Sequence, residues 1–176
     1  LETLRRQLDD YSQIIHHPYF AVNLSAFELY GMKESADDHF ASKDAMDIDG
    51  FSEKTAELLY NETHLEDAVD LMNLTAPDLF GLDGFGDKKI ANLLSSIEKS
   101  KHTTLDRFIF ALGIDGIGKK TAKDLVKRFR TLEKLSNASK AELGAVDGIG
   151  DILADNVYTF FRDSNKVNFI ERLLAS

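Results

Sequence analysis

The sequence predicts an all-α fold in which pairs of helices are joined by tight glycine turns. Three Gly-apolar-Gly triplets begin at Gly84, Gly116 and Gly148, so successive triplets lie 32 residues apart. Apolar residues spaced three and four apart follow each triplet, which is the period of a helix with one buried face. No stretch shows the sustained two-residue alternation with β-branched enrichment that is typical of strands.

A fourth, degenerate copy of the triplet precedes the other three. Gly50-Phe51-Ser52 lies 34 residues before the Gly84 triplet and carries serine in place of the second glycine. An acidic residue stands before every copy, at Asp49, Asp83, Asp115 and Asp147. A repeat at a fixed period of this length indicates one supersecondary unit per copy. We therefore predict four hairpins over residues 39–176.

Start signals and apolar spacing predict the individual helices. Thr75 is the expected N-cap of one helix, with Pro77 in its first turn, and Ser139 with Glu142 has the spacing of a capping box. The first helix of each pair is short, as in Phe108 to Leu112. The apolar residues that predict the second helices are Ile90, Leu93, Leu94 and Ile97, then Ala122, Leu125, Val126 and Phe129, then Ile152, Leu153, Val157, Phe160 and Phe161. Aromatic residues at this spacing, with Phe108 and Phe110, are expected in the core.

Residues 1–38 form a separate N-terminal segment without the repeat. An amphipathic stripe from Leu1 to Ile15 predicts a helix that ends at His16-His17-Pro18. The part from Ala21 onward has no clear period, so we place a boundary near His39. Because the first residue is Leu1 and not methionine, we expect the chain to be a piece of a longer protein.

The net charge of −9 is unevenly distributed along the chain. Residues 1–82 carry 17 acidic and 5 basic side chains, whereas residues 83–176 carry 13 acidic and 16 basic ones. The stretch from Arg107 to Lys134 holds eight Lys or Arg against three acids. Such a local excess can attract phosphate on an acidic protein, although a solvated helix face with scattered lysines is an alternative interpretation.

The composition excludes several classes of protein. The absence of cysteine excludes disulfides, thiolate zinc sites and a cysteine nucleophile. No apolar run reaches the ~18 residues of a membrane span, and no signal peptide opens the chain. His16 and His17 are adjacent and diverge on a helix, so we expect no metal site.

A glycine turn between two helices is suited to binding a phosphate. Glycine adopts the required backbone angles without strain, and its missing side chain lets a phosphate approach the main-chain N–H groups at the start of the second helix. A central apolar residue can tuck between the helices and lock the turn. Such a site holds a nucleic-acid backbone without reading its sequence. The candidate DNA-binding residues are Gly84, Gly86, Lys88, Lys89, Gly116, Ile117, Gly118, Lys119, Lys120, Thr121, Gly148 and Gly150.

The residues after each turn rank the four candidates. The third turn continues into Lys119-Lys120-Thr121 and is the best phosphate site, whereas the second continues into Asp87-Lys88-Lys89 and is a mixed case. The first turn has Ser52 in place of glycine, followed by Glu53, and the fourth continues into Asp151. Both are better candidates for packing, because a carboxylate in the first helical turn repels phosphate. A contact through the backbone alone stays open for the fourth turn.

Three segments together resemble the helix-hairpin-helix domain of bacterial NAD-dependent DNA ligases. They are His39–Gly50, Arg107–Ile114 and Gly116–Ala122, and the Leu74–Leu79 segment and the fourth hairpin agree in order and spacing. The resemblance covers about residues 39–176. It implies a tandem helix-hairpin-helix domain of four hairpins that grips the minor-groove side of nicked duplex DNA, in the bacterial cytoplasm. Its partners would be that DNA and the other domains of the same ligase chain.

The resemblance places catalysis outside this chain. The family's lysine nucleophile lies in a Lys-x-Asp-Gly motif that this sequence lacks, so we expect no catalytic residue and no cofactor here; NAD and magnesium are implied for the parent enzyme only. The family's four-cysteine zinc module is replaced by a cysteine-free segment, in which Ala21 and Ala26 show the spacing of one cysteine pair. The alternative function is a structural or partner-docking scaffold that has lost its affinity for DNA.

Overall fold

The computed structural model describes residues 40–176, and this part of the chain is built from helices and turns, without a strand. The predicted all-α class is confirmed. The predicted N-terminal segment, with its boundary at His39, its His16–His17 pair and its Ala21–Ala26 stretch, lies outside the described residues. Among the helices from residue 40 onward, none is both long and apolar enough to cross a bilayer.

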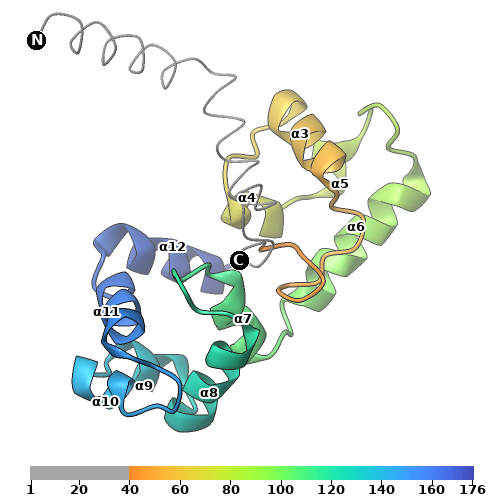
Figure 1. Ribbon diagram of the computed structural model, residues 1–176. Helices are drawn as coiled ribbons and strands as arrows, with labels where there is room; N and C mark the ends of the chain where they lie inside the picture. The colour runs from red at the N-terminus through yellow and green to blue at the C-terminus, as the bar shows by residue number, and fades with distance from the viewer. Residues whose placement is uncertain (1–39) are drawn as a thin grey trace, which may run out of the picture.

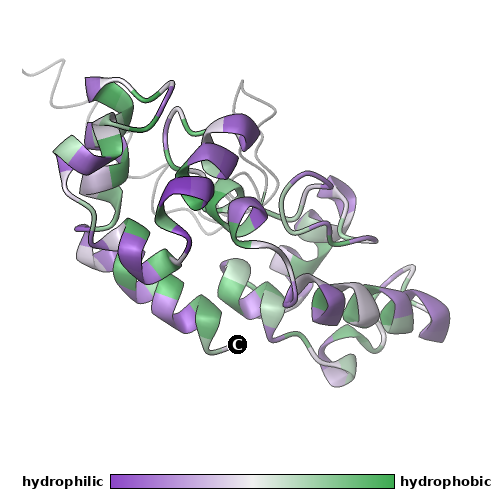
Figure 2. Cartoon of the chain, turned by 90° about the horizontal axis from the view of Figure 1, so that it is seen from below, coloured by the Kyte–Doolittle hydropathy of each residue, from purple (hydrophilic) through white to green (hydrophobic). Residues whose placement is uncertain are grey.

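The helices form two groups that follow one another along the chain (Figure 1). In Figure 2, single helices carry both hydrophobic and hydrophilic residues, as expected of helices with one buried face. The first group comprises α3 (Glu53–Glu62), α4 (Ala68–Met72), α5 (Ala76–Leu79) and α6 (Asp87–Ser100). The second comprises α7 (Leu105–Ala111), α8 (Lys119–Phe129), α9 (Leu132–Ser136), α10 (Lys140–Gly144), α11 (Asp151–Phe160) and α12 (Ser164–Leu174).

The two helix starts predicted from capping signals are confirmed. Thr75 is the N-cap of α5, and its N–H donates to the carboxylate of Asp78 at 2.8 Å. Ser139 is the N-cap of α10, where its hydroxyl accepts from the Glu142 amide and its own N–H donates to the Glu142 carboxylate. Hydrogen bonds from Thr75 hold the pKa of Asp78 below its ordinary value, and those from Ser139 do the same for the pKa of Glu142.

Four turns share one backbone geometry. In each, the amide of the central apolar residue donates to the carbonyl three residues earlier, and the glycine before it has a φ between 72° and 86°. This combination matches a type II turn, whose third position requires a positive φ and therefore favours glycine. The donor and acceptor pairs are Phe51 and Ile48, Phe85 and Leu82, Ile117 and Ile114, and Ile149 and Val146.

The first turn differs from the others in what precedes it. A helix leads into the second, third and fourth turns, but residues 40–46 before the first turn form turns only, so the predicted short helix is wrong here. The segment closes on itself instead, with the Met46 amide donating to Phe40 and the Ile48 amide to Ala41. Burial of Ala45 and Met46 stabilises this compact loop.

The predicted core is confirmed at most positions. The central apolar residues of all four turns are buried, and so are Phe108, Phe110, Phe129 and Phe161. Phe160 is half-buried and packs against the core. Ile152 is the exception, because 78% of its surface is exposed although it belongs to the predicted apolar pattern of α11.

Long-range contacts join the two groups of helices. The C-terminal helix α12 packs against α4, where Arg172 pairs with Asp67 at 3.1 Å. Arg107 on α7 donates through Nε to the Ala45 carbonyl at 2.9 Å and through its terminal nitrogen to the Lys43 carbonyl. These bonds fix the segment before the first turn against the second group.

Two of the turns also pack against a helix of the neighbouring hairpin. Gly50 of the first turn lies against Leu93 of α6, and the Asp49 amide donates to the Ser96 hydroxyl at 2.7 Å. Gly116 of the third turn lies against Leu153 of α11. The hairpins therefore associate in two pairs, the first with the second and the third with the fourth.

Candidate nucleic-acid interface

The helices that follow the second, third and fourth turns begin with uncapped amides. Their N-caps are Gly86, Gly118 and Gly150, each in an extended conformation and each without a side-chain cap. Among the described residues, no backbone carbonyl accepts from the amides of these glycines or of the three residues after each. Each turn therefore presents unpaired N–H groups together with the positive end of a helix dipole.

In the first turn one of these amides is occupied, because serine replaces the second glycine. Ser52 has φ −89° and ψ 167°, nearly the angles of Gly86, and its hydroxyl accepts from the Thr55 amide at 3.3 Å. These angles are open to any residue, so the conformation does not demand glycine at this position. What glycine supplies is the absence of a side chain that would occupy the amides.

Most of the predicted glycines border open space. A Cβ atom placed on Gly84, Gly86, Gly118, Gly148 or Gly150 would meet no described atom within 4 Å. Gly116 differs, since its Cβ would lie 2.5 Å from Leu153 Cδ2. The first glycine of the third turn thus serves packing, while Gly118 keeps the helix start open.

The second turn carries two of the predicted lysines in different settings. Lys88 is exposed, and no ion pair is recorded for it within residues 40–176. Lys89 is half-buried, with its ammonium 4.0 Å from the centre of the Phe85 ring. Lys88 is therefore available to a phosphate, whereas Lys89 is held against the turn that it follows.

The third turn carries the other two lysines, and both have carboxylate partners. Lys119 pairs with Asp44 at 3.0 Å, and Lys120 pairs with Asp124 at 3.2 Å. The Lys119 ammonium lowers the pKa of Asp44 by hydrogen bonding and by its charge. Exposed ion pairs of this kind contribute little to stability because water screens them, so a phosphate can replace the carboxylate at small cost. Thr121 completes the predicted set and is half-buried at the start of α8.

Ile117 was a predicted site residue, but its side chain is buried and its amide donates to Ile114 at 2.9 Å. Neither group is available to a ligand. Its function is to hold the two helices of the hairpin together, as the burial of Phe85 and Ile149 shows for their turns.

Two exposed lysines extend the basic surface beyond the predicted set. Lys123 and Lys127 follow Lys120 on α8 at intervals of three and four residues. Residues with this spacing share one face of a helix, so the three ammonium groups form a stripe that starts at the third turn. Both lysines were visible in the sequence as basic residues after the third turn, but the predicted set of binding residues did not include them.

The fourth turn is open but not basic. Gly148 and Gly150 are exposed, Asp151 occupies the first position of α11, and Ile152 follows it. The carboxylate already balances the helix dipole, which disfavours a phosphate at this place.

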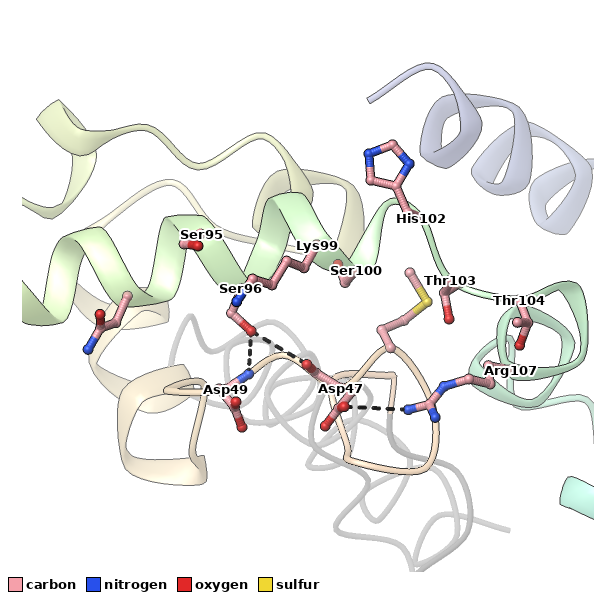
Figure 3. Close-up of a pocket in the computed structure, with 12 residues that line it drawn as sticks. Asp47, Asp49, Ser95, Ser96, Lys99, Ser100, His102, Thr103, Thr104 and Arg107 are labelled. Atoms are coloured by element: carbon pink, nitrogen blue, oxygen red, sulfur yellow. Dashed lines mark hydrogen bonds and ion pairs between the residues drawn. The ribbon is translucent and has the colours of Figure 1, made fainter.

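Two clefts lie near the turns. The larger, of about 690 Å³, is shown in Figure 3 between the C-terminal half of α6, the loop before the first turn and the start of α7. Some of its polar groups bond one another, as Ser96 does with Asp49 and Arg107 with Asp47. A smaller groove of about 370 Å³ runs between α3 and the second turn. Within residues 40–176 no three His, Cys, Asp or Glu side chains gather as metal ligands would.

Comparisons with known proteins agree with this geometry. Residues 107–170, from α7 into α12, match the model of the helix-hairpin-helix motif. The chain is 49% identical over 137 residues to a DNA ligase of Clostridium perfringens, and 50% identical over 137 residues to a DNA ligase of Alkaliphilus metalliredigens. Each alignment covers 78% of this chain and 21% of the relative. The chain therefore spans about a fifth of the length of these relatives.

The repeated turns and the matching motif define a helix-hairpin-helix region. More specifically, this region is similar to a part of bacterial DNA ligases over 137 residues.

Proposed function

We propose that this chain is the part of an NAD-dependent bacterial DNA ligase that holds nicked duplex DNA by its backbone during replication and repair in the cytoplasm. Adenylation and strand joining, with NAD and magnesium, would belong to other domains of the ligase chain. The residues described above bind and orient the DNA, and we assign none of them to the chemical steps.

The proposal is carried by one observation: three turns have the same geometry, and each presents amides without an acceptor beside an exposed glycine. Phosphate oxygens fit such amides through charge-assisted hydrogen bonds and the helix dipole. The amides also account for DNA binding by a chain with a net charge of −9, because oriented dipoles attract phosphate locally. The exposed side chains of Lys88 and Lys120 add positive charge beside the amides of the second and third turns.

A measurement of DNA binding against salt tests this function. We expect the affinity for a nicked duplex to fall with salt, with a slope near −0.9 in log–log form for each phosphate neutralised, and to be independent of base sequence. Lys88→Ala and Lys120→Ala should each flatten the slope by about 0.9. Lys101→Ala is the matched control, because Lys101 lies at the opposite end of α6 from the second turn.

Lys119→Ala together with Lys120→Ala should weaken binding equally across DNA sequences. The alternative function, a docking scaffold without DNA affinity, is favoured by the carboxylate partners of these two lysines. It predicts no salt-dependent binding of DNA by the parent chain. If that result is obtained, the proposed DNA-binding function is wrong and the scaffold function is supported.

A further inference from the structure

Ile152 is an aliphatic side chain that the fold leaves largely exposed. With 78% of its surface exposed, it is the most exposed of the three large apolar residues on the described surface, before Phe80 and Leu174. Its neighbours Leu153 and Val157 are half-buried and buried, as a helix with one apolar face requires. Core packing therefore explains those two residues but leaves Ile152 without an explanation.

The register of the hairpins shows what Ile152 corresponds to. The cap of α11, Gly150, has φ −84° and ψ −179°, and the cap of α8, Gly118, has φ −85° and ψ −179°. Ile152 and Lys120 are each the second residue after these caps, so they project from equivalent places on equivalent turns. Lys120 is 86% exposed at its place. The fourth hairpin thus presents an aliphatic group where the third presents a cation.

The surface around Ile152 is continuous with the third hairpin. Leu153, the next residue, lies against Gly116, and Asn156 donates to the Asp115 carbonyl at 3.1 Å. These contacts place the first turns of α11 beside the third turn. A nucleic-acid strand held at Gly118 and Lys120 would run past the start of α11.

We propose that Ile152 packs against the deoxyribose face of a duplex DNA strand that the third hairpin holds by its phosphates. The inference rests on the proposed function and adds a contact of a different chemistry. Asp151 makes the fourth turn unfavourable for a phosphate, but the C–H edges of deoxyribose are apolar and match an isoleucine side chain. The fourth hairpin then contributes affinity by excluding water, without neutralising a charge.

The test compares Ile152→Ala and Ile152→Lys with the parent chain of 176 residues, using fluorescence anisotropy on a nicked DNA duplex at several salt concentrations. Ile152→Ala should weaken binding by roughly tenfold, from the loss of buried CH₂ groups, with the salt slope unchanged. Ile152→Lys should steepen the slope by about 0.9, because a cation now stands at the DNA. Leu174→Ala, which truncates another exposed aliphatic residue at the end of α12, is the control and should bind like the parent.

Each result separates the two proposals. If the parent binds DNA in a salt-dependent way and both Ile152 variants bind like the parent, the contact with deoxyribose is wrong and the proposed function stands. If the parent does not bind DNA, both fail. If Ile152→Lys dissociates a dimer of the parent without changing DNA binding, Ile152 faces a second copy of the chain, and the contact with deoxyribose is likewise wrong.

Discussion

The two hairpin pairs use one turn geometry but join their members differently. In the first pair, the turn around Gly50 is held on α6 by a hydrogen bond from the Asp49 amide to the Ser96 hydroxyl. In the second pair, the turn around Gly116 is held on α11 by close packing of Leu153, together with a bond from Asn156. Leu153 is three residues after its helix cap and Leu93 is seven, so the first turn sits one helical turn further along its support.

The four turns also show that the two glycines of a triplet have different functions. The first glycine shapes the turn in all four hairpins, since it always has a positive φ. The second glycine leaves the amides of the helix start uncapped after three of the turns, whereas Ser52 caps the Thr55 amide after the first. A turn can therefore keep its geometry while a side chain occupies one of its amides.

The largest effect is expected from Gly116→Ala. A side chain at φ +75° is strained, and its Cβ would displace Leu153, so we expect a loss of about 2–4 kcal/mol in the free energy of unfolding. Gly148→Ala shares the strain, with φ +79°, but borders open space, so its loss should be about 1–2 kcal/mol. Urea denaturation measures both. Equal losses would mean that α11 does not support the third turn.

The polar support of the first pair is tested by Ser96→Ala. Ser96 is buried, and its loss leaves the Asp49 amide without its acceptor, which should lower the free energy of unfolding by about 1–2 kcal/mol. Ser95→Ala is the control, because Ser95 is exposed on the same helix. Identical denaturation curves for the two variants would contradict this account of the first pair.

Much of this comparison was accessible from the sequence, because the turns repeat locally. The period of 32 residues located the Gly84, Gly116 and Gly148 turns, and the place of an apolar residue between two glycines predicted that it would be buried. The contacts between hairpins were not accessible, since Lys119 and Asp44 lie 75 residues apart. Nor does apolar spacing reveal exposure, because Ile152 fits the helical period as well as its buried neighbours do.

A smaller effect is expected from Asp44→Asn, because Asp44 forms an ion pair between the two pairs of hairpins. Asp44, before the first turn, pairs with Lys119, after the third. Without the carboxylate, the Lys119 ammonium is available to a DNA phosphate. The affinity for DNA should therefore rise about two- to threefold at low salt and show no gain at high salt. A competition titration with labelled duplex measures the change. A fall in affinity would show that the ion pair positions Lys119 for DNA.

The smallest effect is expected on the melting temperature at acidic pH. The pKa values of Asp78 and Glu142, in the caps of α5 and α10, lie below their ordinary values because of hydrogen bonds from Thr75 and Ser139. A lowered folded-state pKa adds stability above the unfolded-state pKa, and that stability is lost as the pH falls through the folded value. The melting temperature should therefore decline below about pH 4, and slightly less steeply in Asp78→Asn. Parallel pH profiles would mean that this cap adds nothing.

Gly118→Ser tests most directly whether open amides hold the DNA. The angles of Gly118 suit serine, open space surrounds it, and a serine hydroxyl would accept from the Thr121 amide as Ser52 does from Thr55. We predict an unchanged or slightly higher melting temperature, since serine is the better N-cap, together with a roughly fivefold or greater loss of affinity for nicked duplex DNA. Gly118→Ala adds a methyl group without an acceptor and separates steric exclusion from capture of the amide. A Gly118→Ser variant that binds DNA as tightly as the parent would contradict the account.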